Sequence, residues 1–162
     1  MIRATIQSVI EGAIKRVTAA GRPGETLSDR EYMQHYGYTS RPLAGAEGVI
    51  VNQGNHYILI ATDDRRYRVA VETGEVCLYT DEGDQIRLKR NKEICVKSGN
   101  KLIIEATNDV SVTTKRINLT ATESITLVSP NVAVQGALSA TGNISSSGSI
   151  TDTTGNTNHH SH

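Results

Sequence analysis

The chain ends with two histidines, His160 and His162, that are separated only by Ser161. In an extended segment the side chains at i and i+2 project to the same side, so both imidazoles can face one point. His159 would face the other way. Two imidazoles are fewer ligands than a structural metal site needs. A metal site at this end therefore requires several copies of the chain to meet there.

The other polar residues show no spacing that is typical of catalysis or metal binding. His35 and His56 have no partner at catalytic spacing and are interpreted as surface or barrel residues. Two acidic groups lack the glycine-anchored spacing of a calcium loop and are interpreted as solvated turns. These groups are Asp63 with Asp64, and Asp81 with Glu82 and Asp84. We expect a protein that is not an enzyme.

Composition limits the possible partners of the chain. Its 162 residues allow one domain, or a small domain with an extended appendage. Seventeen basic and seventeen acidic residues cancel, so the overall charge attracts neither nucleic acid nor an anionic membrane. No apolar run approaches the length of a membrane span, and the N-terminus does not resemble a secretory signal. Cys77 and Cys95 are interpreted as small buried hydrophobic residues.

From residue 86 onward, pairs of apolar residues with one residue between them recur at a nearly fixed interval. Such pairs predict short strands, because i and i+2 share a face and most of the residues are β-branched. The interval falls from eight residues to six toward the C-terminus. The units are Ile86/Leu88, Ile94/Val96, Leu102/Ile104, Val110/Val112, Ile117/Leu119, Ile125/Leu127, Val132/Val134, Leu138/Ala140, Ile144 and Ile150.

Each unit offers only a narrow apolar face, so the units must stack into a solenoid with a shared interior. A single-chain β-helix has hexapeptide coils, whereas most of these units are longer. Three chains around one axis, each forming one side of a triangular prism, would close the interior and remove open sheet edges. The shrinking units predict a taper. At about 4.8 Å for each layer, the needle would be roughly 45–50 Å long.

The first half of the chain reads as a small domain. Apolar residues at helical spacing (Ile2, Ile6, Val9, Ile10, Ala13 and Ile14) predict a short N-terminal helix or arm over residues 1–13. Expected strands at 13–19, 30–37, 48–53, 56–62 and 66–72 predict an OB-like barrel over residues 14–85, with a further strand at 75–80 that leads toward the needle. The fold class is thus all-β: an OB-like antiparallel barrel, then an intertwined, tapering triple-stranded β-helix over residues 86–151, as a homotrimer. Residues 152–162 form the expected apex.

The segment GYTSRPLAGAEGVIV (37–51), the tapering repeat and the terminal His-x-His together resemble the central spike of contractile phage tails. The chain is similar to the Mu-like baseplate assembly protein V family. This resemblance implies a trimer at the baseplate tip of the virion, assembled in the host cytoplasm. The barrel would attach to the tail hub, and the needle would cross the host outer membrane when the sheath contracts.

The resemblance also implies a metal ion at the apex. Three chains supply six nitrogens through His160 and His162, which suits octahedral coordination better than a four-ligand zinc site. Imidazole accepts iron, nickel, copper or zinc, so the ligands do not name the ion. The family implies iron at the trimer axis. Members of the family commonly continue past the His-x-His, whereas this sequence stops at His162.

Two other classes of protein share parts of this pattern. A hexapeptide-repeat acyltransferase would keep period six throughout and place a catalytic histidine within its coils, but residues 86–150 contain no histidine. A trimeric tail fibre or adhesin would share the β-prism and bind a surface receptor with its tip. The short, tapered end favours penetration over recognition.

Overall fold

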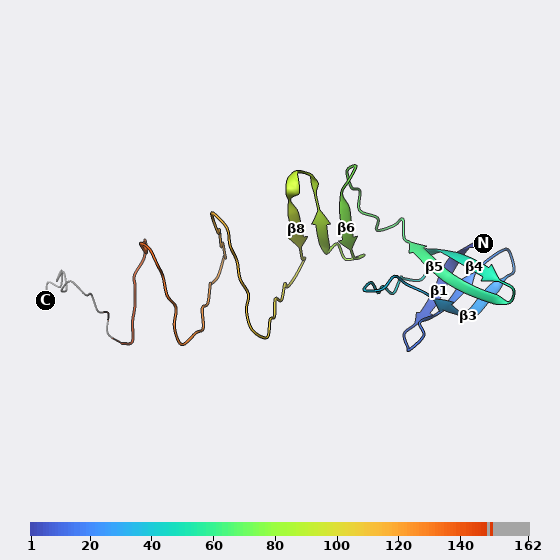
Figure 1. Cartoon of the computed structure of the whole chain (residues 1–162), viewed down its shortest axis with the longest axis horizontal. Coiled ribbons are helices and arrows are strands. Elements are labelled where there is room, and N and C mark those ends of the chain that lie inside the picture. The colour runs from blue at the N-terminus through green and yellow to red at the C-terminus, as the bar shows by residue number, and fades with distance from the viewer. Residues whose placement is uncertain (149, 151–162) are drawn as a thin grey trace. The chain divides into compact units, whose positions relative to one another are not determined.

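A computed structural model describes residues 1–148 and 150 of the chain. Its first part is a closed barrel of five strands, β1 (Ile2–Ile10), β2 (Arg16–Ala20), β3 (Thr26–Tyr32), β4 (Glu47–Gln53) and β5 (His56–Asp63) (Figure 1). The strand order is β1-β2-β3-β5-β4, and β4 pairs with β1 to close the barrel. All the pairs are antiparallel except β3 with β5. This barrel fits the predicted OB-like fold.

The barrel core is made of aliphatic side chains from alternate strand positions. Ile6, Val17, Ile50 and Leu59 are the largest side chains that are completely enclosed. Packing is tight at Gly48 in β4, where an added Cβ would lie 2.6 Å from Leu59 Cδ1. Among the described residues, none after Leu59 is buried. All the buried residues of the described part of the chain therefore lie at or before Leu59, in the barrel and the loop that packs on it.

The predicted N-terminal helix is wrong, because residues 2–10 form strand β1. Ile2, Ala4 and Ile6 are buried at alternate positions, as in any half-buried strand. The register then shifts between Ile6 and Ser8, and the next buried residue is Val9. A bulge adds one residue to a strand and reverses its alternation. The large residues at 2, 6 and 9 therefore imitate the spacing of a helix.

The predicted strand at 66–72 is also wrong. These residues lie in the turn and loop that follow β5. Arg66 folds back on Asp64, and its Nη2 also donates to the Ala44 carbonyl at 3.0 Å. The fifth strand of the barrel comes from the N-terminus instead.

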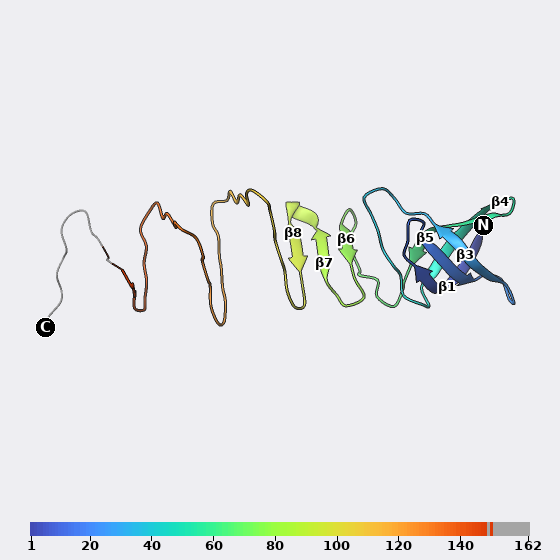
Figure 2. The same cartoon turned by 90° about the horizontal axis from the view of Figure 1, so that it is seen from below.

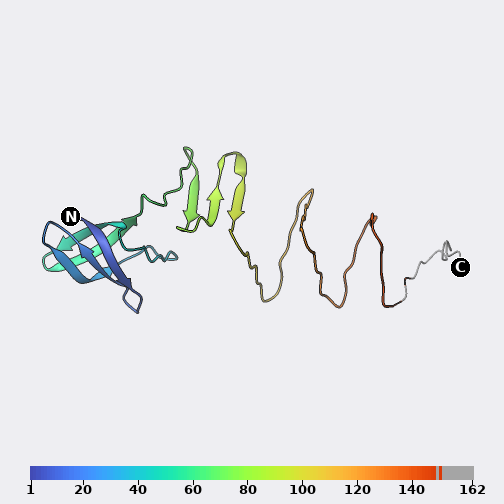
Figure 3. The same ribbon diagram turned by 180° about the vertical axis from the view of Figure 1, so that it is seen from behind.

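A second sheet follows the barrel, with β6 (Val76–Tyr79), β7 (Gln85–Leu88) and β8 (Ile94–Lys97) in sequence order. Each strand is antiparallel to the next, as Figures 1, 2 and 3 show. A short 3₁₀ turn, Arg90–Lys92, joins β7 to β8. The first two predicted repeat units, at 86/88 and 94/96, are therefore strands.

Residues 98–148 contain no assigned strand or helix, and no backbone hydrogen bond joins them to one another. The chain there alternates extended segments with bends. In three of these bends a serine or threonine hydroxyl donates a hydrogen bond to the backbone carbonyl two residues ahead. These bends lie at 114–116, 129–131 and 146–148. Such side-chain turns agree with the turn-prone residues of the repeat. Residues 1–107 form one unit, and the described residues from 108 onward belong to a second one.

The sequence interpretation of the cysteines is wrong for Cys95, which is exposed, while Cys77 is half-buried. Both pair with Arg87 of the middle strand, so they lie on one face of the second sheet. The apolar residues occupy the other face. Within the described part of the chain, no helix is long and apolar enough to cross a bilayer.

Candidate interaction surface

The register of the second sheet places six aliphatic side chains on one face. Residues directly opposite each other in neighbouring strands point to the same side of a sheet. Val76 pairs with Leu88, which pairs with Ile94, and Leu78 pairs with Ile86, which pairs with Val96. These two rows of three are called the aliphatic face here.

The aliphatic face is open to solvent in the single chain. Ile86 lies at its centre and is 48% exposed. The exposure continues along the repeat, where Leu102 is 59% exposed and Ile104 is 70% exposed. Soluble proteins rarely leave a contiguous apolar surface of this kind uncovered unless it binds a partner. The arrangement is therefore suited to binding a partner.

An ion pair fixes the opposite face of this sheet. Arg87 Nε donates to Glu75 Oε2 at 3.0 Å, and the backbone N–H of Arg90 donates to Glu75 Oε1 at 3.2 Å. The carboxylate side chain is only 4% exposed. Hydrogen bonds from Arg87 lower the pKa of Glu75 from its ordinary value of 4.5 to about 2. The charged carboxylate thus ties the start of β6 to β7.

A second ordered region is the loop between β3 and β4, which carries residues 37–46 of the segment 37–51, while the rest of that segment lies in β4. Lys15 Nζ, in a side chain that is 10% exposed, donates to Gln34 Oε1 at 2.9 Å and to the Ser40 carbonyl at 2.7 Å. Gln34 Nε2 in turn donates to Ser40 Oγ at 2.8 Å. These bonds hold the loop on the barrel, while Tyr36 at its tip is fully exposed.

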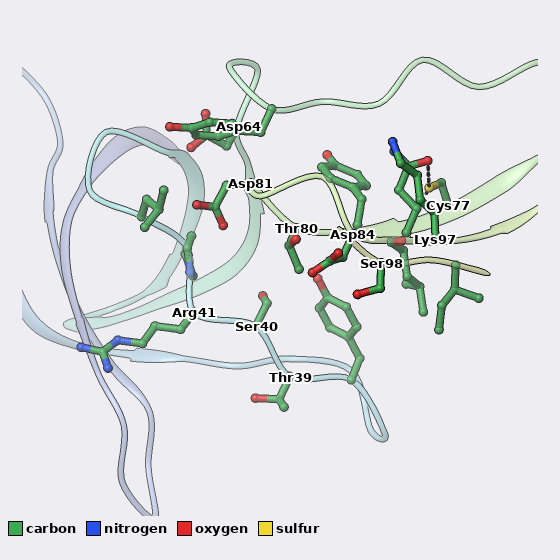
Figure 4. A pocket seen from close by; sticks show the side chains of 18 of the residues that line it. Thr39, Ser40, Arg41, Asp64, Cys77, Thr80, Asp81, Asp84, Lys97 and Ser98 are labelled. Carbon is green, nitrogen blue, oxygen red and sulfur yellow. Dashed lines mark hydrogen bonds between the residues drawn. The ribbon is translucent and has the colours of Figure 1, made fainter. Parts of the chain in front are cut away.

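An open cavity of about 850 Å³ lies between this loop and the second sheet. Figure 4 shows Thr39, Ser40 and Arg41 on the loop side and Asp81 and Asp84 from the turn after β6. Leu78, Ile86 and Val96 of the aliphatic face also line it. The cavity is thus continuous with the exposed apolar surface.

The predicted metal ligands, His160 and His162, lie outside the described residues. His35, in the loop after β3, and His56, at the start of β5, are both exposed, as expected. Asp63 is paired with Arg68 and Asp64 with Arg66. In residues 1–148 and 150 the structure brings no three histidine, cysteine or acidic side chains together as a metal site.

Strand β6 was expected from residues 75–80 and is confirmed, but its Val76/Leu78 pair was not predicted to be the first layer of the aliphatic face. Val76 and Leu78 show the same apolar-x-apolar pattern as the later units. Their distance of ten residues from Ile86 and Leu88 exceeds the regular interval, because the intervening turn includes Gly83 with φ of 91°. The Lys15 network was also missed, and no sequence signal marks it.

Comparisons with known proteins agree with this architecture. Residues 3–66 match a family model described as Bacteriophage Mu Gp45, N-terminal. These residues coincide with the barrel. Over 125 residues the chain is 30% identical to the baseplate puncturing device gp45 of Escherichia phage Mu. The alignment covers 74% of this chain and 63% of that relative, so the chain spans less than two thirds of the relative's length.

Proposed function

We propose that this chain, which belongs to the Mu-like baseplate spike family, is a structural spike of a phage tail baseplate. The barrel is its mount on the tail hub, and the repeat is its needle. Its location is the baseplate tip of the virion, after assembly in the host cytoplasm. The relative is named as a puncturing device, which supports a mechanical rather than an enzymatic role.

The observation that carries this proposal is the open apolar surface of the second half. Every apolar pair of the repeat from residue 86 to 134 has both members at least 47% exposed in the single chain. Residues 98–148 also make no backbone hydrogen bonds with one another. Aliphatic side chains cost free energy when they are exposed to water. The backbone groups are solvated in the single chain, but they would need hydrogen-bond partners once an assembly buries the side chains. Identical chains would supply the missing partners for both.

Three copies suit the width of the sheet. Strands β6–β8 are four residues long, and each turns two aliphatic side chains to the same face. Such a sheet can serve as one wall of a narrow prism, and two further walls complete the interior. We therefore propose an intertwined, tapering triple-stranded β-helix. Because separate chains share every layer, pulling one chain out requires many contacts to break together.

The needle meets the host outer membrane as the sheath contracts, and a rigid tip concentrates the applied force. We propose that His160 and His162 of three chains hold an iron ion on the axis. Six imidazole nitrogens fit an octahedral ion and would join three chain ends at one point. Imidazole must be neutral to bind a metal, so acid should release the ion.

Sedimentation and elemental analysis test this proposal. We expect the full chain to sediment as a trimer and to carry one iron ion for every three chains. The His160→Ala/His162→Ala double variant should lose the metal and remain trimeric. A monomeric wild-type chain would contradict the spike. The alternative, a receptor-binding tail fibre, would instead be supported by saturable binding of the full chain to a host surface glycan.

A further inference from the structure

The two ends of the second sheet carry turns of opposite charge. The turn between β6 and β7 contains Asp81, Glu82 and Asp84 and is called the acidic turn. The turn between β7 and β8 contains Lys89, Arg90 and Lys92, with Glu93, and is called the basic turn. Because the three strands form an antiparallel meander, successive turns lie at opposite ends of the strands. The two turns are therefore held apart in a single chain.

Most charges of these turns have no partner among the described residues. Lys89 pairs with Glu93 at 2.6 Å, which leaves Arg90 and Lys92 unpaired. Asp84 accepts a hydrogen bond from the Gly99 N–H at 2.8 Å. Asp81 and Glu82 are exposed and make no ion pair within the described chain. Each turn thus carries two like charges, Asp81 with Glu82 and Arg90 with Lys92, that make no ion pair with another described residue.

A threefold prism would bring the opposite turns together. If each chain forms one wall with its strands running across the axis, the ends of the strands lie at the corners. A rotational assembly of three joins one side of each subunit to the other side of the next. We propose that the acidic turn of one chain docks against the basic turn of the neighbouring copy at each corner. This inference rests on the proposed trimer.

Two features of the structure favour a second copy as the partner. The first is charge complementarity, because one surface of the chain carries the charges that neutralise another surface of the same chain. The second is the open cavity of about 850 Å³ beside the acidic turn, which leaves room for an approaching turn. Its lining also includes Arg41, Lys97 and Lys101, so the acidic side chains provide only part of its charge.

The basic turn is already shaped for this contact. Asn91 and Lys92 have φ values of 60° and 63°, in the left-handed region that residues other than glycine rarely adopt. The backbone N–H of Lys89 donates to the Glu93 carbonyl at 2.8 Å and closes the turn. A closed turn presents Arg90 and Lys92 with little further ordering, which lowers the entropic cost of association.

Charged residues of both signs recur farther along the sequence, but they do not continue a strict alternation of turns. After the basic turn come two more basic residues, Lys97 and Lys101. An acidic pair, a basic pair and a single acidic residue then follow. These residues are Glu105 and Asp109, then Lys115 and Arg116, then Glu123. Glu123 is the last charged residue before Asp152, and the proposed corner contact is therefore argued only for the two turns of the second sheet.

Charge reversal of the full chain tests the inference. One variant carries Asp81→Lys and Glu82→Lys, a second carries Arg90→Glu and Lys92→Glu, and a third combines all four. Asp84 and Lys89 are kept because they already have partners in their own chain. The control is Arg22→Glu, which changes an exposed charge in the barrel. Trimer dissociation is measured by sedimentation in 0.15 M and 1 M NaCl, and circular dichroism checks the fold.

We expect each double variant to dissociate about tenfold faster than wild type at the lower salt concentration, with a smaller difference in 1 M NaCl. The quadruple variant should return to within about threefold of wild type, because the exchanged charges attract again. The Arg22→Glu control should dissociate at the wild-type rate.

Wild-type dissociation rates in both double variants, or a quadruple variant that is no more stable than either double variant, would overturn the inference. If a double variant fails to form trimers, assembly of the quadruple variant still shows whether the exchanged charges restore the contact. A monomeric wild-type chain would instead contradict the trimer itself, so the two failures are distinguishable.

Discussion

Replacement of Ile86 by alanine tests whether the aliphatic face is buried in the assembled protein. In the single chain Ile86 is 48% exposed and lies between Leu78 and Val96 in the sheet register. Substitutions at exposed sites usually change stability by no more than about 0.5 kcal/mol. Truncation of a buried isoleucine to alanine costs about 2–5 kcal/mol. Because three copies change together, a trimer that buries the face should lose about 6–15 kcal/mol.

The assay is denaturant unfolding of the full chain at several protein concentrations, with sedimentation at each step. We expect Ile86→Ala to lower the midpoint of trimer dissociation strongly and to leave the barrel transition in place. Leu59→Ala is the matched control, because Leu59 is completely buried in the barrel. It should destabilise the barrel by about 2–5 kcal/mol without loosening the needle. A loss below about 0.5 kcal/mol per chain for Ile86→Ala would refute the buried face.

Three further predictions concern single contacts. Arg87 lowers the pKa of Glu75 from its ordinary value of 4.5 to about 2. The charged pair therefore stabilises the β6–β7 hairpin fully above pH 4.5. This stabilisation is lost as the pH falls from 4.5 toward 2. Glu75→Gln should therefore flatten the acid limb of a pH-dependent unfolding curve of the needle, and an unchanged limb would contradict this role. Gly48→Ala would place a Cβ 2.6 Å from Leu59 Cδ1. It should destabilise the barrel by about 1–3 kcal/mol, measured by denaturant unfolding. An unchanged stability would mean that the Leu59 side chain moves aside without cost. Lys15→Met removes the donor that holds the loop before β4, so limited proteolysis should cut that loop faster than in the wild-type chain. Equal cleavage rates in the variant and the wild type would contradict this role.

The sequence predicted the type of the barrel better than its strands. Turn residues and alternating apolar residues correctly indicated five strands closing into an OB-like barrel. The choice of strands failed at β1, where the bulge after Ile6 converted alternation into apparent helical spacing. It failed again at 66–72, where alternating residues lie in a loop tied down by ion pairs such as Arg66 with Asp64. A bulge and a side-chain ion pair are set by tertiary structure, so local spacing does not reveal them.

The candidate site was predictable to a different degree in its two parts. The repeat units at Ile86 and Ile94 were predicted as strands because apolar and polar residues alternate there, which places the apolar side chains on one face. The structure confirms both strands. The preceding strand at 75–80 was also expected, but its Val76/Leu78 pair was not recognised as a repeat unit because ten residues separate it from Ile86/Leu88. The polar network around Lys15 depends on residues from two distant segments. Only the folded barrel brings these segments together.

Alternation shows that a strand has a buried side but does not show which chain covers it. Strands β1 and β5, of nine and eight residues, are long enough to curve across a barrel and meet side chains of their own chain. Strands β6–β8 have four residues each and contribute only two aliphatic side chains per strand to one face. A sheet that narrow has too little surface to enclose a core by itself. In the proposed trimer, identical copies supply the other walls, and their oppositely charged turns would set which edge of one wall meets which edge of the next.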